Sequence, residues 1–339
     1  GLTRPLGGHY AEAIAAFNLL PIPRLAVDLP SGLNGSTAEI IGPHVEADLT
    51  VTFGAPKVPH VLLPAAEASG EVVVADLGIP DQLIEQAAGH LHLLTGEELA
   101  DRWKRRSPES HKGDFGHAVV VAGSVGKAGA AILTASGAVR AGAGLVTVAA
   151  PGSIVQTVDG GSIESMTLPL REGAEGGLEV ENLDGILEFL AGKQALAVGP
   201  GLGTHPSTVD LIRRLVGSSP VPVVLDADGV NGFAGLMDSL AEGLSPRVLT
   251  PHPGELARLM EVSTAEVQAD RVGHASTAAA RTDSIVVLKG AQSLVALPDG
   301  EIFVNPTGNP GMATGGTGDV LTGLIAGLVS QGYDLPAAA

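Results

Sequence analysis

Residues 117–149 have the sequence HAVVVAGSVGKAGAAILTASGAVRAGAGLVTVA, in which short apolar runs flank an Ala-rich stretch. The apolar runs, bounded by Gly, predict buried strands at Val119–Ala122 and Leu145–Ala149. Ala128–Ala141 is rich in the residue with the highest helix propensity and predicts a helix between the two strands. A strand, a helix and a strand in this order favour a parallel βαβ unit, so the fold class is α/β.

The same alternation continues towards the C-terminus. It predicts further strands at 195–198, 221–225, 285–289 and 294–297, the last two adjacent, and helices at 183–190, 209–216, 253–260 and 320–329. Short apolar strands separated by helices are typical of a doubly wound sheet with helices on both faces, an α/β/α sandwich. No internal repeat is present.

The N-terminal region has a different pattern. A helical pattern covers Tyr10–Leu20, and short Val- and Leu-rich runs follow at 25–29, 49–53 and 71–77. We place a domain boundary between residues 92 and 93, giving domains 1–92 and 93–339. The charged stretch 101–108 is the best linker candidate, and its basic cluster is more typical of a solvated connector than of a binding patch.

Composition excludes several classes of protein. The chain of 339 residues has 19 Lys and Arg against 37 Asp and Glu, a net charge of −18. Nucleic-acid phosphates are bound chiefly by Lys and Arg, so we expect no nucleic-acid partner. No apolar run reaches the roughly 18 residues of a membrane span, so we expect no membrane partner. The absence of Cys excludes disulfides, thiol chemistry and Cys-ligated zinc.

The segment Asn305–Asp319 carries the strongest chemical signal. Five glycines and three threonines lead into an apolar helix that we expect to begin near Asp319. Backbone N–H groups at a helix N-terminus bind anions, which predicts an anion hole. Its residues are Thr314, Gly315, Gly316, Thr317 and Gly318. Asp319 is then placed to act as a general base on a hydroxyl group involved in phosphoryl transfer; the alternative is a helix N-cap.

Other Gly-rich or polar segments follow predicted strands, where ligands of such sheets bind. They are Gly123-Ser124, Gly199–Gly203, Asp226 with Asp228, Thr250–Glu255 and Lys289-Gly290. Each is a weak signal alone. The two aspartates are either close to a metal or residues that form turns at a strand end, and we favour the second interpretation.

The segment Asn305–Asp319 resembles the anion-hole signature of ribokinase-like kinases, which ends in the catalytic Asp. Four more stretches narrow the resemblance: 111–117, 141–146, 198–203 and 249–255. Together, over about residues 95–335, they resemble the ADP/ATP-dependent NAD(P)H-hydrate dehydratases. The resemblance implies a ribokinase-like α/β/α sandwich.

Residues 1–6, 27–32 and 52–57 resemble the C-terminal half of an NAD(P)H-hydrate epimerase domain. The resemblance implies a partial Rossmann-like domain, with Asp28 contacting substrate and Ser31 at a potassium site. The family's Gly-Asn-Asn-Gly-Gly-Asp-Gly loop is absent, and we expect it to lie upstream of Gly1. Both chain ends have the character of cut ends, and we expect residues 1–90 neither to fold fully nor to epimerise in this chain.

The combined resemblance implies a multifunctional metabolite-repair enzyme, a lyase and isomerase that binds NAD(P)H hydrates and an adenine nucleotide. ADP or ATP donates a phosphoryl group to the hydrate hydroxyl, with Mg²⁺ screening the phosphates and K⁺ in the epimerase half. Asp319 is the base; Ala130, Gly203, His252 and Asn309 contact the hydrate. The nucleotide lies on Lys289, Gly290, Ala291, Gln292, Ser293 and Gly318. A cytoplasmic homo-oligomer, such as a tetramer, is the family expectation.

Two alternatives remain open. A small-molecule kinase of the same fold would share the anion hole, since fold does not determine function. A stable phosphorylated product, rather than release of phosphate, would identify it. A non-catalytic nucleotide-binding module would bind nucleotide equally well after Asp319→Asn and show no turnover.

Overall fold

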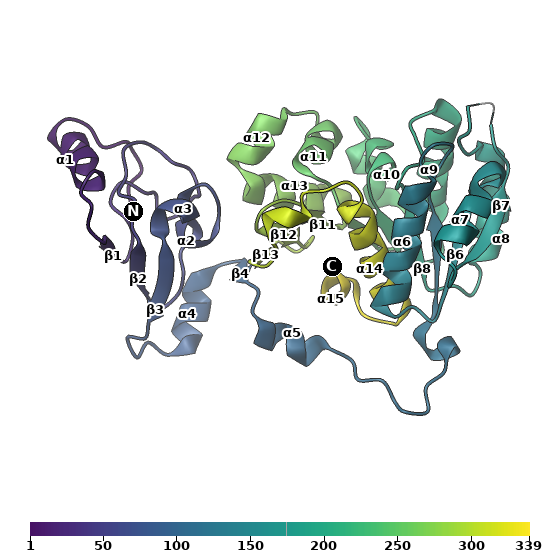
Figure 1. Ribbon diagram of the computed structural model, residues 1–339, viewed down its shortest axis with the longest axis horizontal. Coiled ribbons are helices and arrows are strands. Elements are labelled where there is room, and N and C mark those ends of the chain that lie inside the picture. Colours follow the sequence, from purple (N-terminus) through teal and green to yellow (C-terminus); the bar gives the residue numbers. More distant parts are fainter. Residues whose placement is uncertain (174) are drawn as a thin grey trace. The chain divides into compact units, whose positions relative to one another are not determined.

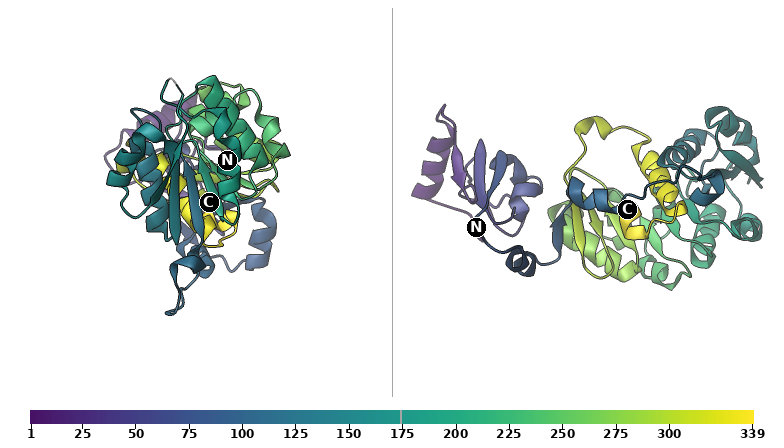
Figure 2. Two further views of the ribbon diagram at one scale, coloured as in Figure 1. Left: turned by 90° about the vertical axis from the view of Figure 1, so that its right-hand side faces the viewer. Right: turned by 90° about the horizontal axis from the view of Figure 1, so that it is seen from below.

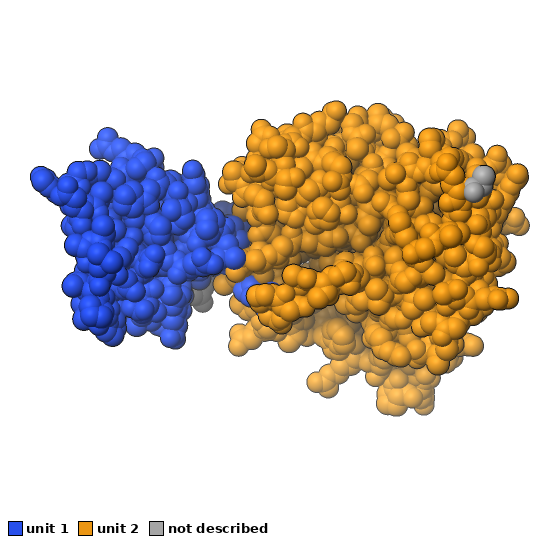
Figure 3. All heavy atoms as spheres, turned by 45° about the horizontal axis from the view of Figure 1, so that its top comes forward, with its two compact units in different colours: residues 1–92, 306–308 blue, residues 93–305, 309–339 orange. Residues whose placement is uncertain are grey.

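A computed structural model describes residues 1–173 and 175–339, and the side chains of these residues except 81, 85 and 88. The chain forms two compact units (Figure 3). Unit 1 comprises residues 1–92 and 306–308, and unit 2 comprises 93–305 and 309–339. Among the described residues, no helix combines the length and apolarity needed to cross a bilayer.

Unit 1 is built on a small parallel sheet in the order β1-β2-β3. Its elements are α1 (His9–Asn18), β1 (Leu25–Val27), β2 (Leu49–Phe53), α2 (Val58–Val61), α3 (Ala65–Ser69), β3 (Glu71–Ala75) and α4 (Asp81–Ala88). β1 ends earlier than the apolar run predicts, because Asp28 takes a left-handed backbone conformation (φ 67°) that turns the chain. Its core is small: Leu33, Ala65 and Ala68 form one buried cluster.

Unit 2 contains the large sheet, with strand order β13-β12-β11-β10-β9-β8-β5-β6-β7. β12 is antiparallel to both neighbours and the other pairs are parallel. The strands are β5 (His117–Val121), β6 (Leu145–Pro151), β7 (Met166–Leu170), β8 (Ala195–Val198), β9 (Val223–Leu225), β10 (Arg247–Leu249), β11 (Ile285–Leu288), β12 (Ser293–Ala296) and β13 (Ile302–Asn305), with β4 (Leu91–Leu93) at the boundary between the units.

The chain order reverses at β5, which lies between β6 and β8 (Val119 is paired with Thr147 and with Leu196). Successive crossovers therefore run in opposite directions and place helices on both faces of the sheet (Figure 2). The helices are α5 (Gly96–Arg102), α6 (Ala128–Ala141), α7 (Val155–Gly161), α8 (Leu183–Leu190), α9 (Pro206–Ser218), α10 (Asp228–Asn231), α11 (Pro253–Met260), α12 (Thr264–Ala269), α13 (Arg271–Thr282), α14 (Thr317–Ser330) and α15 (Leu335–Ala338).

Helices α6 and α14 lie side by side over the central strands (Figure 1). Glycines bring their backbones into contact: a Cβ added to Gly137 would lie 2.5 Å from the Val320 carbonyl oxygen, and one added to Gly323 would lie 2.0 Å from that of Thr134. Such distances exclude any side chain. This contact sets the position of α14, and with it the Gly/Thr segment that precedes the helix.

The contact predicts a stability change. Gly323→Ala should lower the free energy of unfolding by about 3 kcal/mol or more, because the added methyl group forces the two helices apart. Gly185→Ala on α8 is the matched control; its added Cβ would meet nothing within 4 Å. The control should be neutral or stabilising by up to about 1 kcal/mol. Urea unfolding measures both; an unchanged midpoint for Gly323→Ala would contradict the tight packing.

Candidate active site

The N-terminus of α14 is the centre of the candidate site. The helix begins at Thr317 with Gly316 as N-cap, two residues earlier than the sequence pattern predicts. Asp319 is therefore its third residue and makes no cap hydrogen bond, so the N-cap alternative is wrong. The first N–H groups of a helix have no intrahelical acceptor, which leaves those of Thr317 and Gly318 available to an anion.

The Gly/Thr segment is organised by its own hydroxyl groups. Thr317 Oγ1 donates to the Met312 carbonyl oxygen at 2.9 Å, and the Thr314 N–H donates to the same oxygen at 2.9 Å. The Thr314 N–H is thus engaged in a turn and differs in this respect from the other predicted anion-hole donors. Asn309 Oδ1 accepts from Gly311 N at 2.9 Å, so its observed contact shapes this loop.

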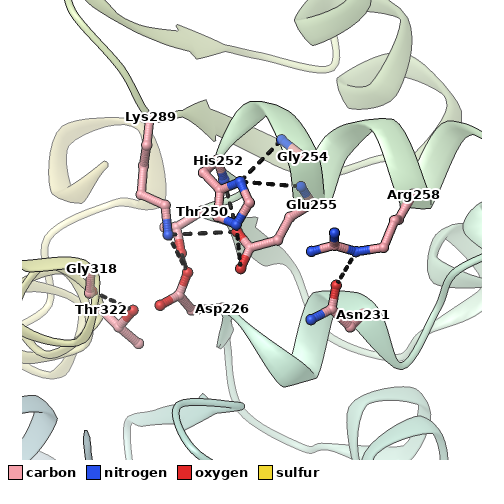
Figure 4. A network of polar contacts seen from close by, with 10 residues as sticks. All are labelled: Asp226, Asn231, Thr250, His252, Gly254, Glu255, Arg258, Lys289, Gly318 and Thr322. Carbon is pink, nitrogen blue, oxygen red and sulfur yellow. Dashed lines mark hydrogen bonds and ion pairs between the residues drawn. The ribbon is translucent and has the colours of Figure 1, made fainter. Parts of the chain in front are cut away.

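Asp226, Lys289 and Gly318 come together beside this helix end (Figure 4). Lys289 Nζ donates to Asp226 Oδ1 at 2.7 Å. A Cβ added to Gly318 would lie 3.2 Å from Lys289 Nζ and 3.7 Å from Asp226 Oδ2. A side chain at position 318 would therefore press on the Lys289 ammonium group, which lies next to the start of α14.

Asp319 has the most strongly perturbed acid–base behaviour near this point. Its burial, together with the charge of Asp226, raises the pKa of Asp319 to about 6, against a smaller opposing effect of Lys289. Ordinary aspartates titrate near 3.8. A carboxylate whose pKa is near the working pH is well suited to accept a proton.

Asp226, for which we favoured a structural role at a strand end, directly follows β9 and is buried. Only 1% of it is exposed, and its Oδ1 also accepts from Thr250 Oγ1 at 2.7 Å. Lys289 Nζ reaches a second carboxylate, Glu255 Oε2, at 3.7 Å. Thr250 and Glu255 both belong to the segment 250–255 that the sequence singled out, and the structure places this segment after β10.

His252 forms the N-cap of α11 and belongs to the same network (Figure 4). Its Nδ1 accepts from Gly254 N at 3.0 Å and Glu255 N at 3.3 Å. In the neutral ring the proton is therefore on Nε2, which lies 3.4 Å from Glu255 Oε1. About half of the side chain is exposed, so the ring remains open to a ligand.

Of the predicted substrate residues, Ala130 lies in the first turn of α6, just after the loop that follows β5, and Gly203 lies in the loop that follows β8. The loops touch: Gly123 N donates to Pro200 O at 2.8 Å, and a Cβ on Gly201 would lie 2.9 Å from Ala130 Cβ. Asp228 Oδ2 accepts from Gly203 N at 2.8 Å and lies 3.5 Å from Lys127 Nζ. Asp228 thus holds the Gly203 loop.

The predicted nucleotide segment Lys289–Ser293 is the turn between β11 and β12. Gly290 and Gln292 both have positive φ, and the Ser293 hydroxyl donates to the Gly290 carbonyl oxygen at 3.1 Å. Gly290 and Ala291 are exposed. The turn follows Lys289 directly, and the Lys289 ammonium group lies beside Gly318 at the start of α14.

Unit 1 has a separate polar cluster around Asp28. Lys57 Nζ donates to Asp28 Oδ1 at 2.7 Å and to Thr52 Oγ1 at 2.8 Å, and this hydrogen bond from Lys57 holds the pKa of Asp28 below its ordinary value. His60 is buried, which lowers the pKa of its ring, and its Nε2 has no partner among the described residues. Lys57 ends the epimerase-like segment 52–57 but was given no role of its own, and His60 was not singled out from the sequence.

Ser31 lies apart from that cluster, on a cavity of about 610 Å³ lined mainly by apolar side chains such as Leu6, Tyr10 and Phe17. Its carbonyl oxygen already accepts from Val45 N at 2.8 Å. The role of Ser31 at a potassium site stays a prediction.

Known proteins are similar to this chain over almost its whole length. The Moorella thermoacetica bifunctional NAD(P)H-hydrate repair enzyme Nnr is 45% identical over 325 residues, which cover 96% of this chain and 61% of the relative. That of Thermofilum pendens is 40% identical, covering 98% and 63%. The chain thus spans somewhat less than two thirds of the length of these relatives.

Among solved structures, the ADP/ATP-dependent NAD(P)H-hydrate dehydratase of Bacillus subtilis, co-crystallised with ATP/Mg²⁺, matches with a TM-score of 0.60 and 32% identity, over 74% of this chain and 85% of that one. A ribokinase-like superfamily protein of Enterococcus faecalis matches with a TM-score of 0.61 and 25% identity, over the same shares. The predicted ribokinase-like α/β sandwich is confirmed.

Family models match both parts of the chain. The model described as YjeF-related protein N-terminus matches residues 1–58, where the sequence resembles an epimerase. The model for NAD(P)H-hydrate dehydratase matches residues 118–339, which is more than half of the chain. The protein therefore belongs to the NAD(P)H-hydrate dehydratase family.

Proposed function

We propose that the domain formed by residues 93–339 dehydrates the S-hydrate of NADH or NADPH with an adenine nucleotide as phosphoryl donor, ADP being the expected one. The observation that carries the proposal is Asp319, whose pKa is raised to about 6, within a helix N-terminus and beside Lys289 and Asp226. Residues 1–92 would contribute the epimerase-related domain of a longer bifunctional protein.

In the first step, the hydrate hydroxyl oxygen attacks the terminal phosphorus of the nucleotide. The hydroxyl proton passes to the Asp319 carboxylate, and the bond from phosphorus to the leaving nucleotide oxygen breaks, giving AMP from ADP. The N–H groups at the start of α14 stabilise the negative charge on the transferring phosphoryl oxygens, and the positive charge of Lys289 lies beside them.

In the second step, the C–O bond to the new phosphate ester breaks and phosphate leaves. The adjacent ring carbon loses a proton, and the ring double bond of the dihydropyridine is restored. Phosphorylation is what makes this elimination possible, because hydroxide is a far poorer leaving group than phosphate. His252, Ala130 and Gly203 are proposed to bind the hydrate.

The residues of this site are compatible with Mg²⁺ bound mainly by the phosphates of the nucleotide. Among the described residues, no group of three or more His, Asp or Glu side chains forms a metal cage. Mg²⁺ commonly binds through substrate phosphates and water with only one or two carboxylates, and Asp226 and Asp319 are the carboxylates at this place. Bound there, it would neutralise the charge of the phosphates. K⁺ is proposed only for the epimerase-related part and takes no part in these two steps.

The assembly into a homo-oligomer, a tetramer being the family expectation, and the cytoplasmic location also remain proposals that rest on the resemblance. Light scattering of the purified chain measures the first. A single monomeric mass over the working concentration range would refute it.

The first prediction concerns turnover. Purified protein with the S-hydrate of NADH, Mg²⁺ and ADP or ATP should show rising absorbance at 340 nm that requires the nucleotide and releases phosphate. Asp319→Asn should lower kcat by at least about a hundredfold, because the proton acceptor is removed. Asp238→Asn is the matched control, an exposed aspartate paired with Arg281. A stable phosphorylated product would instead identify a kinase.

The second prediction concerns pH. The deprotonated Asp319 is the active form, so kcat/KM should fall as the pH drops through about 6. Asp226→Asn removes the neighbouring negative charge that raises this pKa and should move the midpoint of the acid limb to lower pH. A pH–rate profile of both proteins measures the shift. An acid limb near 4 in the wild type would contradict the role of a buried Asp319.

The third prediction concerns stability. Because folding raises the pKa of Asp319 from 3.8 to about 6, the folded state loses stability as the pH rises through that interval. Asp319→Asn has no such cost and should be more stable than the wild type at pH 8 by about 1–2 kcal/mol, allowing for partial solvation. Denaturant unfolding at pH 8 and pH 4 checks this; the difference should disappear at pH 4.

A further inference from the structure

The side chain of Arg271, the first residue of α13, donates hydrogen bonds to the backbone of the turn between β11 and β12. Its Nη1 donates to the Ala291 carbonyl oxygen at 2.6 Å, and its Nη2 donates to those of Gln292 at 3.2 Å and Leu288 at 3.4 Å. One side chain thus binds backbone atoms on both sides of Gly290, at which an added Cβ would lie 3.0 Å from Nη2.

The guanidinium group has an unusual environment. No carboxylate lies within ion-pair distance of it among the described residues, and its Nε is buried without a hydrogen-bond partner. Burial lowers the pKa of Arg271. Arg281, on the same helix, forms a bidentate surface pair with Asp238 (2.8 and 2.7 Å). A partly buried cation balanced only by carbonyl dipoles is costly, so its benefit lies in the turn that it shapes.

The shape of the turn orients its donors. In a planar trans peptide the C=O and N–H point in opposite directions, so the Ala291 carbonyl that faces Arg271 directs the Gln292 N–H the other way. Gln292 has φ 46°, a conformation that residues other than Gly rarely adopt. Among the described residues, none accepts a hydrogen bond from the N–H of Gly290, Ala291 or Gln292. These donors lie in an exposed turn and remain available to a ligand.

We propose that Arg271 is a positioning residue for the adenine nucleotide: it holds the turn from Lys289 to Gln292 so that the backbone donors and Lys289 meet the nucleotide together. This inference rests on the proposed function. Lys289 lies beside Gly318 at the start of α14, so the turn continues the same binding surface. Arg271 acts through the turn and contacts no reacting atom.

Two variants test the proposal. Arg271→Gln removes the charge and most of the carbonyl contacts, whereas Arg271→Lys keeps the charge but loses the fork of donors. We expect Arg271→Gln to raise Kd and KM for ADP about tenfold or more, with kcat at saturating ADP and KM for the hydrate within about twofold of wild type. The Kd and KM of Arg271→Lys for ADP should lie between those of the wild type and those of Arg271→Gln. Calorimetry with ADP alone gives Kd, and the 340 nm assay gives the kinetic constants.

Arg281→Gln is the matched control, since it removes an Arg from the same helix without touching the turn. Its Kd for ADP should equal that of the wild type. Added guanidinium ion should restore ADP binding to Arg271→Gln, and an equal concentration of ammonium should restore less. If Arg271→Gln does not fold, Arg271→Lys carries the same comparison of KM with kcat.

Three outcomes would overturn the inference. Wild-type affinity for ADP in Arg271→Gln would show that nucleotide binding does not need the hydrogen bonds from Arg271 to the turn. A parallel loss of kcat, hydrate binding and thermal stability would show a structural role only. Absence of ADP binding to the wild-type protein would remove the proposed function itself, and is distinguishable because it appears before any variant is made.

Discussion

The contact of α6 with α14 is the constraint on which the rest of the site depends. Because glycines let the two backbones touch, α14 is held over the central strands, and its N-terminus has one position. A helix N-terminus binds anions only if its N–H groups are directed at the ligand, so the packing of the helix body determines the chemistry at its end. The glycines at this interface are structural, while Gly318 is adjacent to the chemistry.

The site also contains an unfavourable electrostatic interaction between two carboxylates. Asp226 and Asp319 share the neighbourhood of one ammonium group, and Lys289 makes its hydrogen bond to Asp226. Asp319 is left with burial and a like charge, which explains its raised pKa. A bound nucleotide brings further negative charge, and a divalent cation would relieve it. Such a destabilised carboxylate is what a proton acceptor near neutral pH requires, and folding stability is lower as a result.

In unit 1 an aspartate and a lysine also lie together, but there the pKa of the aspartate is lowered. Asp28, which follows β1, accepts a hydrogen bond directly from Lys57, the N-cap residue of α2, and the pKa of Asp28 is lowered. An aspartate held in this way stays ionised and suits binding rather than proton transfer near neutral pH. The difference arises from which carboxylate receives the lysine hydrogen bond.

The amino-acid sequence by itself determined the βαβ alternation, most of the strands and the Gly/Thr segment that leads into a helix, because propensity and periodicity act over neighbouring residues. It also pointed to Asp319 as the residue that ends this segment. Strands β4, β7, β10 and β13 were missed, as were several helices, among them α7, α12 and α13, and α14 starts earlier than predicted. Only the tertiary structure decided that Asp226 pairs with Lys289, 63 residues away, and that Arg271 clamps its turn. These contacts depend on strand order and helix packing, which no local pattern encodes.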